Sequence, residues 1–261
     1  MISISVLGCG WLGLPLAKGL VNDLFQVKGS VRSEEKTEAL KQISVIPYVL
    51  DLDKQEQDWA PFLHSDILVI AIPSKNIEGF SSLIALIEQS SIKHLVFVSS
   101  TSVYADKNGV VTEDQSALNA SVLYQIESLF TQSTAFSTTI IRFSGLVGYS
   151  RNPGRFFAKS GRSVSNPDAP VNMIHQDDCV ELIKQIIKQE KWNNLFNACA
   201  DTHPTKREFY TQATQRIGIA PPCFIESDEQ TFKIISNQKI KDTLGYEFIY
   251  PDVMKITYDE C

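Results

Sequence analysis

Three glycines near the start of the chain have the spacing of a phosphate-binding turn, and an apolar run precedes them while a helical pattern follows. Gly8 permits a tight turn, Gly10 lets the backbone approach a pyrophosphate, and Gly13 lets the helix and strand pack closely. The helix that follows offers N–H groups and the positive end of its dipole to an anion. The turn therefore predicts a dinucleotide site that includes Trp11 and Leu12, with a glycine-rich turn that holds no ligand as the alternative.

The segment after the second predicted strand bears on the choice of dinucleotide. A site for NAD(H) usually has an Asp or Glu there that binds the ribose 2′-hydroxyl, and this chain has neither. It has Arg32, Ser33 and Lys36, whose guanidinium, hydroxyl and ammonium groups suit a 2′-phosphate. The sequence thus favours NADP(H) over NAD(H). In the alternative interpretation, Arg32 pairs with Glu34 or Glu35 at a solvated helix start.

Short apolar runs alternate with helical patterns in the first half of the chain, which is typical of a parallel sheet covered by helices on both faces. The predicted strands are Ile2–Leu7, Phe25–Val31, Val45–Val49, Asp66–Ile72, His94–Ser100 and Thr138–Phe143. The predicted helices are Leu12–Val21, Glu34–Gln42, Ile77–Gln89 and Leu118–Gln132. This order predicts an α/β, doubly wound, Rossmann-type fold. Three residues at or just after the ends of predicted strands complete the predicted cofactor site: Asp51, Ala71 and Ser99.

Beyond residue 148 the chain becomes richer in Gly, Pro, Asn and Ser, which indicates loops. We expect a dinucleotide-binding Rossmann domain over 1–148 and a small α+β substrate lobe over 149–261, partly interleaved with it. Within this lobe the predicted helices are Gln176–Gln189 and Thr205–Ile217, and the predicted strands are Val171–Ile174, Leu195–Ala198 and Cys223–Ile225.

Charge and composition exclude several classes of protein. The net charge of -6 argues against nucleic acid as a partner, and no apolar run reaches the roughly 20 residues that cross a bilayer. We therefore expect a cytoplasmic protein without a membrane partner. Its cysteines are scattered, so they predict neither a disulfide framework nor a metal site. Cys9 is either a thiol activated by the helix end or a residue small enough for the turn.

Several motifs, in order over nearly the whole chain, resemble those of extended short-chain dehydrogenase/reductases, the NAD-dependent epimerase/dehydratase family. They are His94–Asp106, Arg142–Gly148, Ile174–Asp178, Leu195–Ala198 and Ser236–Tyr246. The resemblance implies an α/β fold, a pyridine dinucleotide, a small-molecule substrate and a homodimer formed through helices that cover the sheet.

The resemblance also implies catalytic residues. In the family, a Ser or Thr after the fifth strand polarises a substrate oxygen, and a Tyr-x-x-x-Lys pair moves the proton. Ser100 matches the serine, and its neighbour Thr101 is the substitute. Tyr124 is the tyrosine on the expected helix, but the residue four positions later is Ser128.

A second alignment of this helix does not restore the pair. If Glu127 is placed on the acid that follows the family lysine, the Tyr and Lys positions fall on Asn119 and Leu123. No lysine occurs between Lys107 and Lys159. Tyr124 then has either a catalytic or a packing role, and Tyr104 becomes an alternative proton donor.

Two functions follow from these residues. One is an NADP(H)-dependent oxidoreductase or epimerase-like enzyme for a small polar substrate, with sugar derivatives as one class. The other is an NADP(H)-binding sensor or regulatory protein that has lost the redox step. A hydrolase triad of Ser100, His175 and Asp178 is not predicted because the nucleophile-elbow motif is missing, and His175 is expected to be a structural histidine.

Overall fold

The computed structural model describes residues 2–54, 56–115, 120–156, 163–226 and 231–258. Contacts divide the chain into two compact units, each made of several segments. Unit 1 comprises Met1–Val103, Asn119–Arg142 and Val180–Phe196. Unit 2 comprises Tyr104–Leu118, Phe143–Cys179 and Asn197–Cys261.

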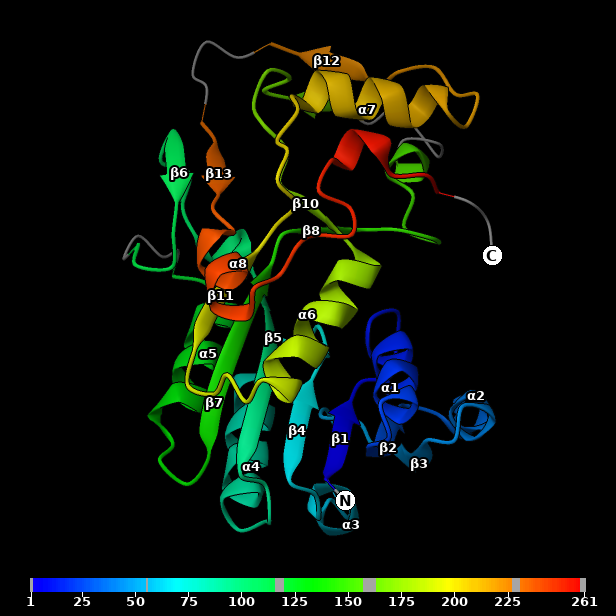
Figure 1. Ribbon diagram of the computed structural model, residues 1–261, viewed down its shortest axis with the longest axis vertical. Coiled ribbons are helices and arrows are strands. Elements are labelled where there is room, and N and C mark those ends of the chain that lie inside the picture. Colours follow the sequence, from blue (N-terminus) through cyan, green and yellow to red (C-terminus); the bar gives the residue numbers. More distant parts are fainter. Residues whose placement is uncertain (1, 55, 116–119, 157–162, 227–230, 259–261) are drawn as a thin grey trace. The chain divides into compact units, whose positions relative to one another are not determined.

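A seven-stranded sheet forms the centre of the fold, in the order β11-β7-β5-β4-β1-β2-β3 (Figure 1). The strands β1 to β5 pair in parallel. This order, with the chain running outward from β1 in both directions, is the doubly wound arrangement, so the predicted fold class is confirmed. The strands are β1 (Ser3–Leu7), β2 (Gln26–Val31), β3 (Ile46–Val49), β4 (Ile67–Ile70), β5 (His94–Ser100), β7 (Ser137–Phe143) and β11 (Leu195–Ala198).

Helices cover both faces of this sheet because alternate strand residues point to opposite sides and are apolar on both. Leu7 belongs to the cluster that packs against α4 and α5, while Val6 lies beneath the start of α1. Helix α6 lies beside α1, since its Lys184 bonds with Asp23 at the end of α1. The helices are α1 (Gly13–Asn22), α2 (Thr37–Gln42), α3 (Ala60–Leu63), α4 (Ile77–Glu88), α5 (Val122–Gln132) and α6 (Gln176–Lys188).

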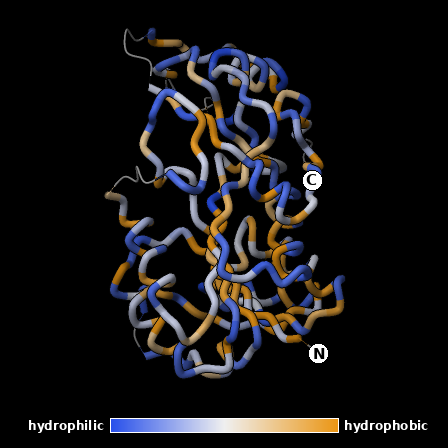
Figure 2. The backbone as a smooth tube through the Cα atoms, turned by 60° about the vertical axis from the view of Figure 1, so that its left-hand side comes forward, coloured by the Kyte–Doolittle hydropathy of each residue, from blue (hydrophilic) through white to orange (hydrophobic). Residues whose placement is uncertain are grey.

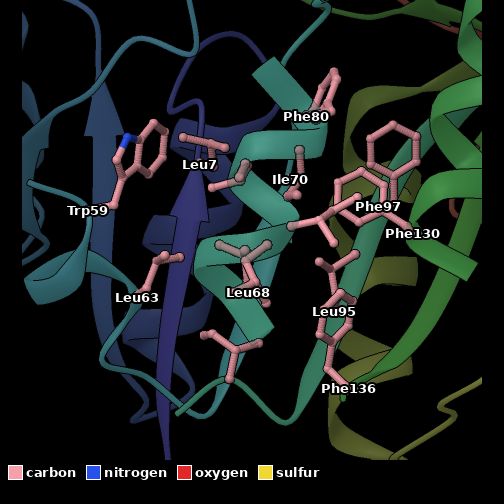
Figure 3. Close-up of a cluster of buried hydrophobic side chains, with 14 of the residues drawn as sticks. Leu7, Trp59, Leu63, Leu68, Ile70, Phe80, Leu95, Phe97, Phe130 and Phe136 are labelled. Carbon is pink, nitrogen blue, oxygen red and sulfur yellow. The ribbon is translucent and has the colours of Figure 1, made fainter. Parts of the chain in front are cut away.

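The main apolar core lies between the sheet and helices α3, α4 and α5 (Figure 3). Phe80, Phe97 and Phe130 meet there in edge-on and tilted contacts with ring centroids 5.0–6.0 Å apart. Such aromatic pairs add to the free energy gained from buried area. Figure 2 shows the apolar residues concentrated along the strands of the sheet. This core fixes the carboxyl ends of the strands, where the loops of the predicted site begin.

Unit 2 contains short two-stranded parallel sheets, in which β8 pairs with β10, β9 with β12 and β6 with β13. Its own apolar cluster includes Val147, Phe209 and Ile256. The strands are β6 (Gly109–Val111), β8 (Gly145–Val147), β9 (Ser163–Ser165), β10 (Met173–His175), β12 (Cys223–Ile225) and β13 (Lys233–Ile235). The helices are α7 (Lys206–Gln215) and α8 (Gln238–Leu244). The 3₁₀ turns of the described residues are η1 (Glu34–Lys36), η2 (Thr101–Val103), η3 (Pro153–Phe156) and η4 (Val253–Lys255).

Two sequence-based expectations need correction. The strand Leu195–Ala198 was expected in the smaller lobe, but as β11 it forms the edge of the central sheet beside β7. Helix α6 carries the chain back to that edge, as crossover helices do between parallel strands. Helix α5 begins at Val122 because Ser121 caps it by accepting a hydrogen bond from the N–H of Tyr124, and the predicted start at Leu118 lies outside the described residues.

No described helix is long and apolar enough to cross a membrane.

Candidate functional site

The glycine turn joins β1 to α1, and its three glycines meet different surroundings. Gly8 has a φ of +97°, and a Cβ there would overlap the side chain of Ile72. A Cβ on Gly13 would overlap the carbonyl oxygen of Gly8. Gly10 is exposed, and a Cβ there would meet nothing within 4 Å. Gly8 and Gly13 are therefore required by the fold itself, whereas the fold leaves open space beside Gly10 that a ligand can enter.

Hydrogen bonds fix the shape of this turn. The N–H of Gly8 donates to Ser30 Oγ at 2.9 Å, and the N–H of Cys9 donates to the carbonyl oxygen of Ser30 at 2.8 Å. Leu12, the N-cap residue of α1, makes no side-chain capping bond, and no acidic residue occupies the first turn of the helix. The positive end of the helix dipole is thus not neutralised by a local carboxylate. An open cradle at Gly10 beside such a helix end fits a pyrophosphate.

The thiol of Cys9 lies beneath the turn. Cys9 is buried, and its Sγ is 3.7 Å from the carbonyl oxygen of Val6. Burial raises the pKa of this thiol to about 12. A Cβ on Gly29 would come within 2.7 Å of the sulfur, so there is no room for a larger side chain. Of the two interpretations of Cys9, the structure favours the one based on size, because a thiol with this pKa is not reactive.

The end of β2 presents the residues predicted to contact a ribose phosphate. Arg32 and Lys36 are exposed and Ser33 is half-buried. Ser33 has extended backbone geometry and precedes the 3₁₀ turn η1 without making a side-chain capping bond. Among the ion pairs of the described residues, none joins Arg32 to Glu34 or Glu35, so the alternative pairing of Arg32 is not observed.

The other three predicted cofactor residues follow neighbouring strands. Asp51 is half-buried, and its Oδ1 accepts a hydrogen bond from the N–H of Asp53 at 3.2 Å. Ala71 lies beside the turn, because a Cβ on Gly8 would come 3.0 Å from its carbonyl oxygen. Ser99 is only 6% exposed, and its hydroxyl donates to Glu127. The structure places Ala71 beside the glycine turn. The hydroxyl of Ser99 instead donates its proton to a buried carboxylate in the core.

The predicted catalytic residues begin at the end of β5. Ser100 is half-buried, and its Oγ accepts a hydrogen bond from the N–H of Ser102 at 3.1 Å, which leaves its proton available to a further acceptor. Thr101 is buried at the start of η2. Tyr104 belongs to unit 2, is 1% exposed, and donates its phenol proton to Asn197 Oδ1 at 2.9 Å.

Helix α5 carries Tyr124, which is half-buried. Four residues later, Ser128 donates its hydroxyl to the carbonyl oxygen of Tyr124 at 3.0 Å. In the alignment that places Tyr124 on the family tyrosine, the position of the family lysine thus holds a neutral side chain bonded to the helix backbone. The alternative position Asn119 lies outside the described residues, and Leu123 packs at the edge of the main core.

A buried ion pair near these residues was not found by sequence reasoning. Arg142 on β7 and Glu127 on α5 are 3% and 2% exposed, and Arg142 Nε donates to Glu127 Oε1 at 3.0 Å. A second guanidinium nitrogen of Arg142 binds the other oxygen, and Ser99 adds a hydroxyl. This network joins α5 to β5 and β7. The sequence shows only that an acid, Glu127, lies on the apolar face of α5, and it does not show which residue pairs with it.

In unit 2, the two acids at the start of α6 have separate roles. Asp178 is fully buried and accepts hydrogen bonds from the phenol of Tyr246 and from the N–H groups of Ile249 and Tyr250. Burial raises the pKa of Asp178. Asp177 is more exposed and accepts from the phenols of Tyr149 and Tyr250. Within the described residues, no group of three His, Cys, Asp or Glu side chains could hold a metal ion.

His175 gives this part of unit 2 a pH dependence. Its imidazole is 2% exposed, and burial lowers its pKa. The unfolded chain therefore binds a proton near pH 6.5 that the native state binds less readily. We expect the free energy of unfolding to fall as the pH drops through about 6.5, and His175→Gln to make this fall shallower. Urea unfolding at several pH values measures the slope, and equal slopes for the two proteins would contradict the expectation.

Comparisons with known proteins agree with this geometry. A family model described as NAD(P)H-binding matches residues 8–190. Protein YeeZ of Escherichia coli (strain K12) is 32% identical over an alignment of 269 positions, which covers 97% of this chain and 97% of YeeZ. A Methylobacillus flagellatus structure described as an NAD-dependent epimerase/dehydratase is 26% identical, with a TM-score of 0.79 over 96% of this chain and 94% of that one.

A more distant structure supports the fold alone. UDP-glucuronic acid 4-epimerase from Bacillus cereus, in complex with NAD, is 15% identical and has a TM-score of 0.79 over 97% of this chain and 95% of that one. Together the matches confirm the family resemblance that the sequence motifs predicted.

Proposed function

Because this chain belongs to the NAD(P)H-binding family, we propose that it is an NADP(H)-preferring oxidoreductase or epimerase-like enzyme for a small polar substrate. The observation that carries the cofactor preference is at the end of β2. Arg32 and Lys36 are exposed cations there, and no Asp or Glu occupies the position that would bind a ribose 2′-hydroxyl. A guanidinium and an ammonium held in this way suit a dianionic phosphate.

Each part of the turn has a binding role in this proposal. Gly10 admits the pyrophosphate, and the N-terminus of α1 places N–H groups and a positive dipole end beside it. Ser30 holds the turn in this shape through the N–H groups of Gly8 and Cys9. Arg32, Ser33 and Lys36 bind the 2′-phosphate, while Asp51 and Ala71 line the adjacent loops.

The substrate side of the proposal rests on the end of β5. The nicotinamide ring, when bound, supplies or accepts a hydride. Ser100 orients and polarises a substrate oxygen, because the backbone N–H of Ser102 bonds to its Oγ and leaves its proton to donate. Thr101 is the second hydroxyl at this end. Tyr124 is the phenol on α5 that could move a proton, although no lysine follows it four residues later.

Sugar derivatives are the favoured substrate class. The epimerase from Bacillus cereus named above acts on UDP-glucuronic acid, and another neighbour of the fold was solved in complex with UDP-glucose and NAD. Their sequence identities are 15% and 18%. They therefore suggest nucleotide sugars as the class of compounds to test, and they do not identify one substrate.

A second function, a sensor that binds NADP(H) without turning it over, is favoured by one observation. Ser128 occupies the position of the family lysine and bonds to the backbone of its own helix. Tyr104, the other candidate proton donor, is buried and donates its proton to Asn197. A protein in which no lysine follows Tyr124 four residues later and Tyr104 gives its proton to Asn197 could bind the cofactor and report its state to a partner.

Replacing Arg32 with alanine tests the cofactor preference. We expect Arg32→Ala to weaken NADPH binding by about 10- to 100-fold, or roughly 1.4 to 2.7 kcal/mol, and to change NADH binding by less than threefold. Fluorescence titration of the purified protein with each dinucleotide measures both constants. Arg155→Ala, which removes an exposed arginine from unit 2, is the matched control. Equal losses for NADPH and NADH would overturn the assignment of Arg32 to the 2′-phosphate.

Turnover distinguishes the enzyme from the sensor. The protein is saturated with NADPH, and absorbance at the nicotinamide band is followed with a panel of aldehydes, ketones and nucleotide sugars. Oxidation of NADPH that is lost in Ser100→Ala supports the enzyme. An epimerase leaves no net change in its cofactor, so the protein is also incubated with NADP⁺ and the nucleotide sugars, and the sugar products are separated by chromatography. Tight binding of the dinucleotide with neither NADPH oxidation nor an epimerised product favours the sensor.

A further inference from the structure

Four side chains of unit 2 form a polar aromatic cluster, which we call the Asp177 cluster: Tyr149, His175, Asp177 and Tyr250. They come from the turn after β8, the end of β10, the start of α6 and the C-terminal segment. Tyr149 donates its phenol proton to Asp177, with its oxygen 3.0 and 3.1 Å from the two carboxylate oxygens. Tyr250 donates to the same carboxylate at 3.3 Å. Phenols from two separate segments thus converge on the carboxylate of a third.

The backbone at Tyr149 is strained. Its φ is +47°, in the left-handed region that Gly and Asn adopt far more readily than an aromatic residue. The turn is closed by backbone hydrogen bonds between Gly148 and Arg151. Tyr149 is nevertheless 38% exposed, so its side chain is not retained to fill the core. A strained and exposed aromatic residue that is held by a specific partner is typical of a functional position.

The chemistry of the cluster suits recognition rather than proton transfer. A carboxylate beside a phenol disfavours the phenolate, and both burial and Asp177 raise the pKa of Tyr250. Asp177 therefore opposes the use of the Tyr250 phenol as an acid or base near neutral pH. With their protons donated to Asp177, the two phenol oxygens can only accept hydrogen bonds from a further group.

The base of the cluster is rigid. His175 is 2% exposed, and its Nδ1 accepts the backbone N–H of Asp177 at 3.2 Å. Its ring centroid lies 3.9 Å from that of Tyr250 and 5.4 Å from that of Tyr149. A Cβ on Gly148 would come within 2.6 Å of the imidazole, so the turn packs directly on this ring. The acceptor oxygens are thus held in place before a ligand arrives.

We infer that Tyr149, Asp177 and Tyr250 form a recognition site for the hydroxyl groups of a neutral sugar moiety. Their oxygens match hydroxyl donors, and an aromatic ring that is partly exposed suits the apolar face of a sugar. The charge of Asp177 selects against a carboxylate on the ligand, because like charges repel. The inference rests on the proposed function, since it places the sugar of its substrate class at this cluster.

The first experiment compares UDP-glucose, UDP-glucuronic acid and UDP by calorimetric titration of the NADPH-saturated protein. We expect UDP-glucose to bind at least 10-fold more tightly than UDP, and more tightly than UDP-glucuronic acid. Asp177→Asn is expected to remove the preference for UDP-glucose over UDP-glucuronic acid. Tyr149→Phe is expected to bring the affinity for UDP-glucose to within about threefold of that for UDP. Equal binding of UDP-glucose and UDP by the unmodified protein would overturn the inference, as would no binding of UDP-glucose.

The second experiment uses the strain at Tyr149. If the side chain serves a ligand, Tyr149→Asn relieves backbone strain, so Tm stays level or rises while the affinity for UDP-glucose falls at least 10-fold. Leu24→Asn is the control, because Leu24 has a φ of +67° and is 81% exposed in unit 1. It should raise Tm without changing either affinity. A lower Tm for Tyr149→Asn together with unchanged UDP-glucose binding would show a purely structural role.

Titration with NADPH alone separates the two proposals. Loss of UDP-glucose binding in the variants with intact NADPH binding supports the site. If the unmodified protein binds UDP-glucose but not NADPH, the proposed function fails while the recognition site stands.

Discussion

Replacing Gly10 with valine is expected to abolish the binding of both NADPH and NADH while leaving the stability of the protein nearly unchanged. The φ of Gly10 is not in the left-handed region, and a Cβ there meets nothing within 4 Å. The fold therefore accepts a side chain, but that side chain fills the space that a pyrophosphate would occupy. We expect affinity to fall by at least about 100-fold, or roughly 2.7 kcal/mol, for each dinucleotide.

Gly13→Ala is the matched comparison within the same turn. A Cβ there overlaps the carbonyl oxygen of Gly8, so this smaller change should lower the free energy of unfolding by about 1 to 3 kcal/mol. Urea unfolding and dinucleotide titration are measured on both variants. If Gly10→Val binds NADPH as tightly as the unmodified protein, the turn does not bind the pyrophosphate, and the proposed function loses its main support.

Breaking the buried pair of Glu127 and Arg142 is expected to be among the most destabilising single changes in unit 1. Both side chains are at most 3% exposed, and the guanidinium is bonded to both carboxylate oxygens. Glu127→Ala leaves the charge of Arg142 buried without its carboxylate. We expect the free energy of unfolding to fall by about 3 to 5 kcal/mol, measured by urea denaturation.

Two comparisons test the reason for this loss. Glu38→Ala removes the pair with Lys41, in which both side chains are more than half exposed, and should cost less than about 1 kcal/mol. The double change Glu127→Leu and Arg142→Met removes both charges and should recover most of the stability lost in Glu127→Ala, because no unpaired charge remains buried. A double variant as unstable as the single one would show that packing, rather than the unpaired charge, sets the cost.

The local pattern of apolar and turn-forming residues was sufficient to predict most of the strands and helices. Each strand in the first half of the chain is a short apolar run next to a turn signal, and β2, β5 and β7 were predicted to within one residue at either end. The placement of β11 was wrong because Leu195–Ala198 has the same local pattern whether it pairs with a small sheet or with the central one. Strand pairing depends on where α6 returns the chain, and that is a tertiary property.

The glycine turn was readable from sequence because all of its parts lie within a few residues of one another. Phosphate binding at a helix start needs only a strand, a turn and a helix in succession. The cations were readable for the same reason, since Arg32 directly follows β2 and Lys36 ends the short turn η1 that comes next. The absence of a Tyr-x-x-x-Lys pair on α5 is likewise a property of the sequence.

Only the tertiary structure decided which polar side chains are free to act. Ser99, a predicted cofactor contact, gives its hydroxyl to Glu127, which is 28 positions away in the chain. Tyr104, a predicted proton donor, gives its own to Asn197, 93 positions away. The sequence by itself determined the fold class, the phosphate turn and the charges beside it. It did not determine these partners, because a hydrogen bond between distant segments depends on how the chain folds back and not on any local pattern.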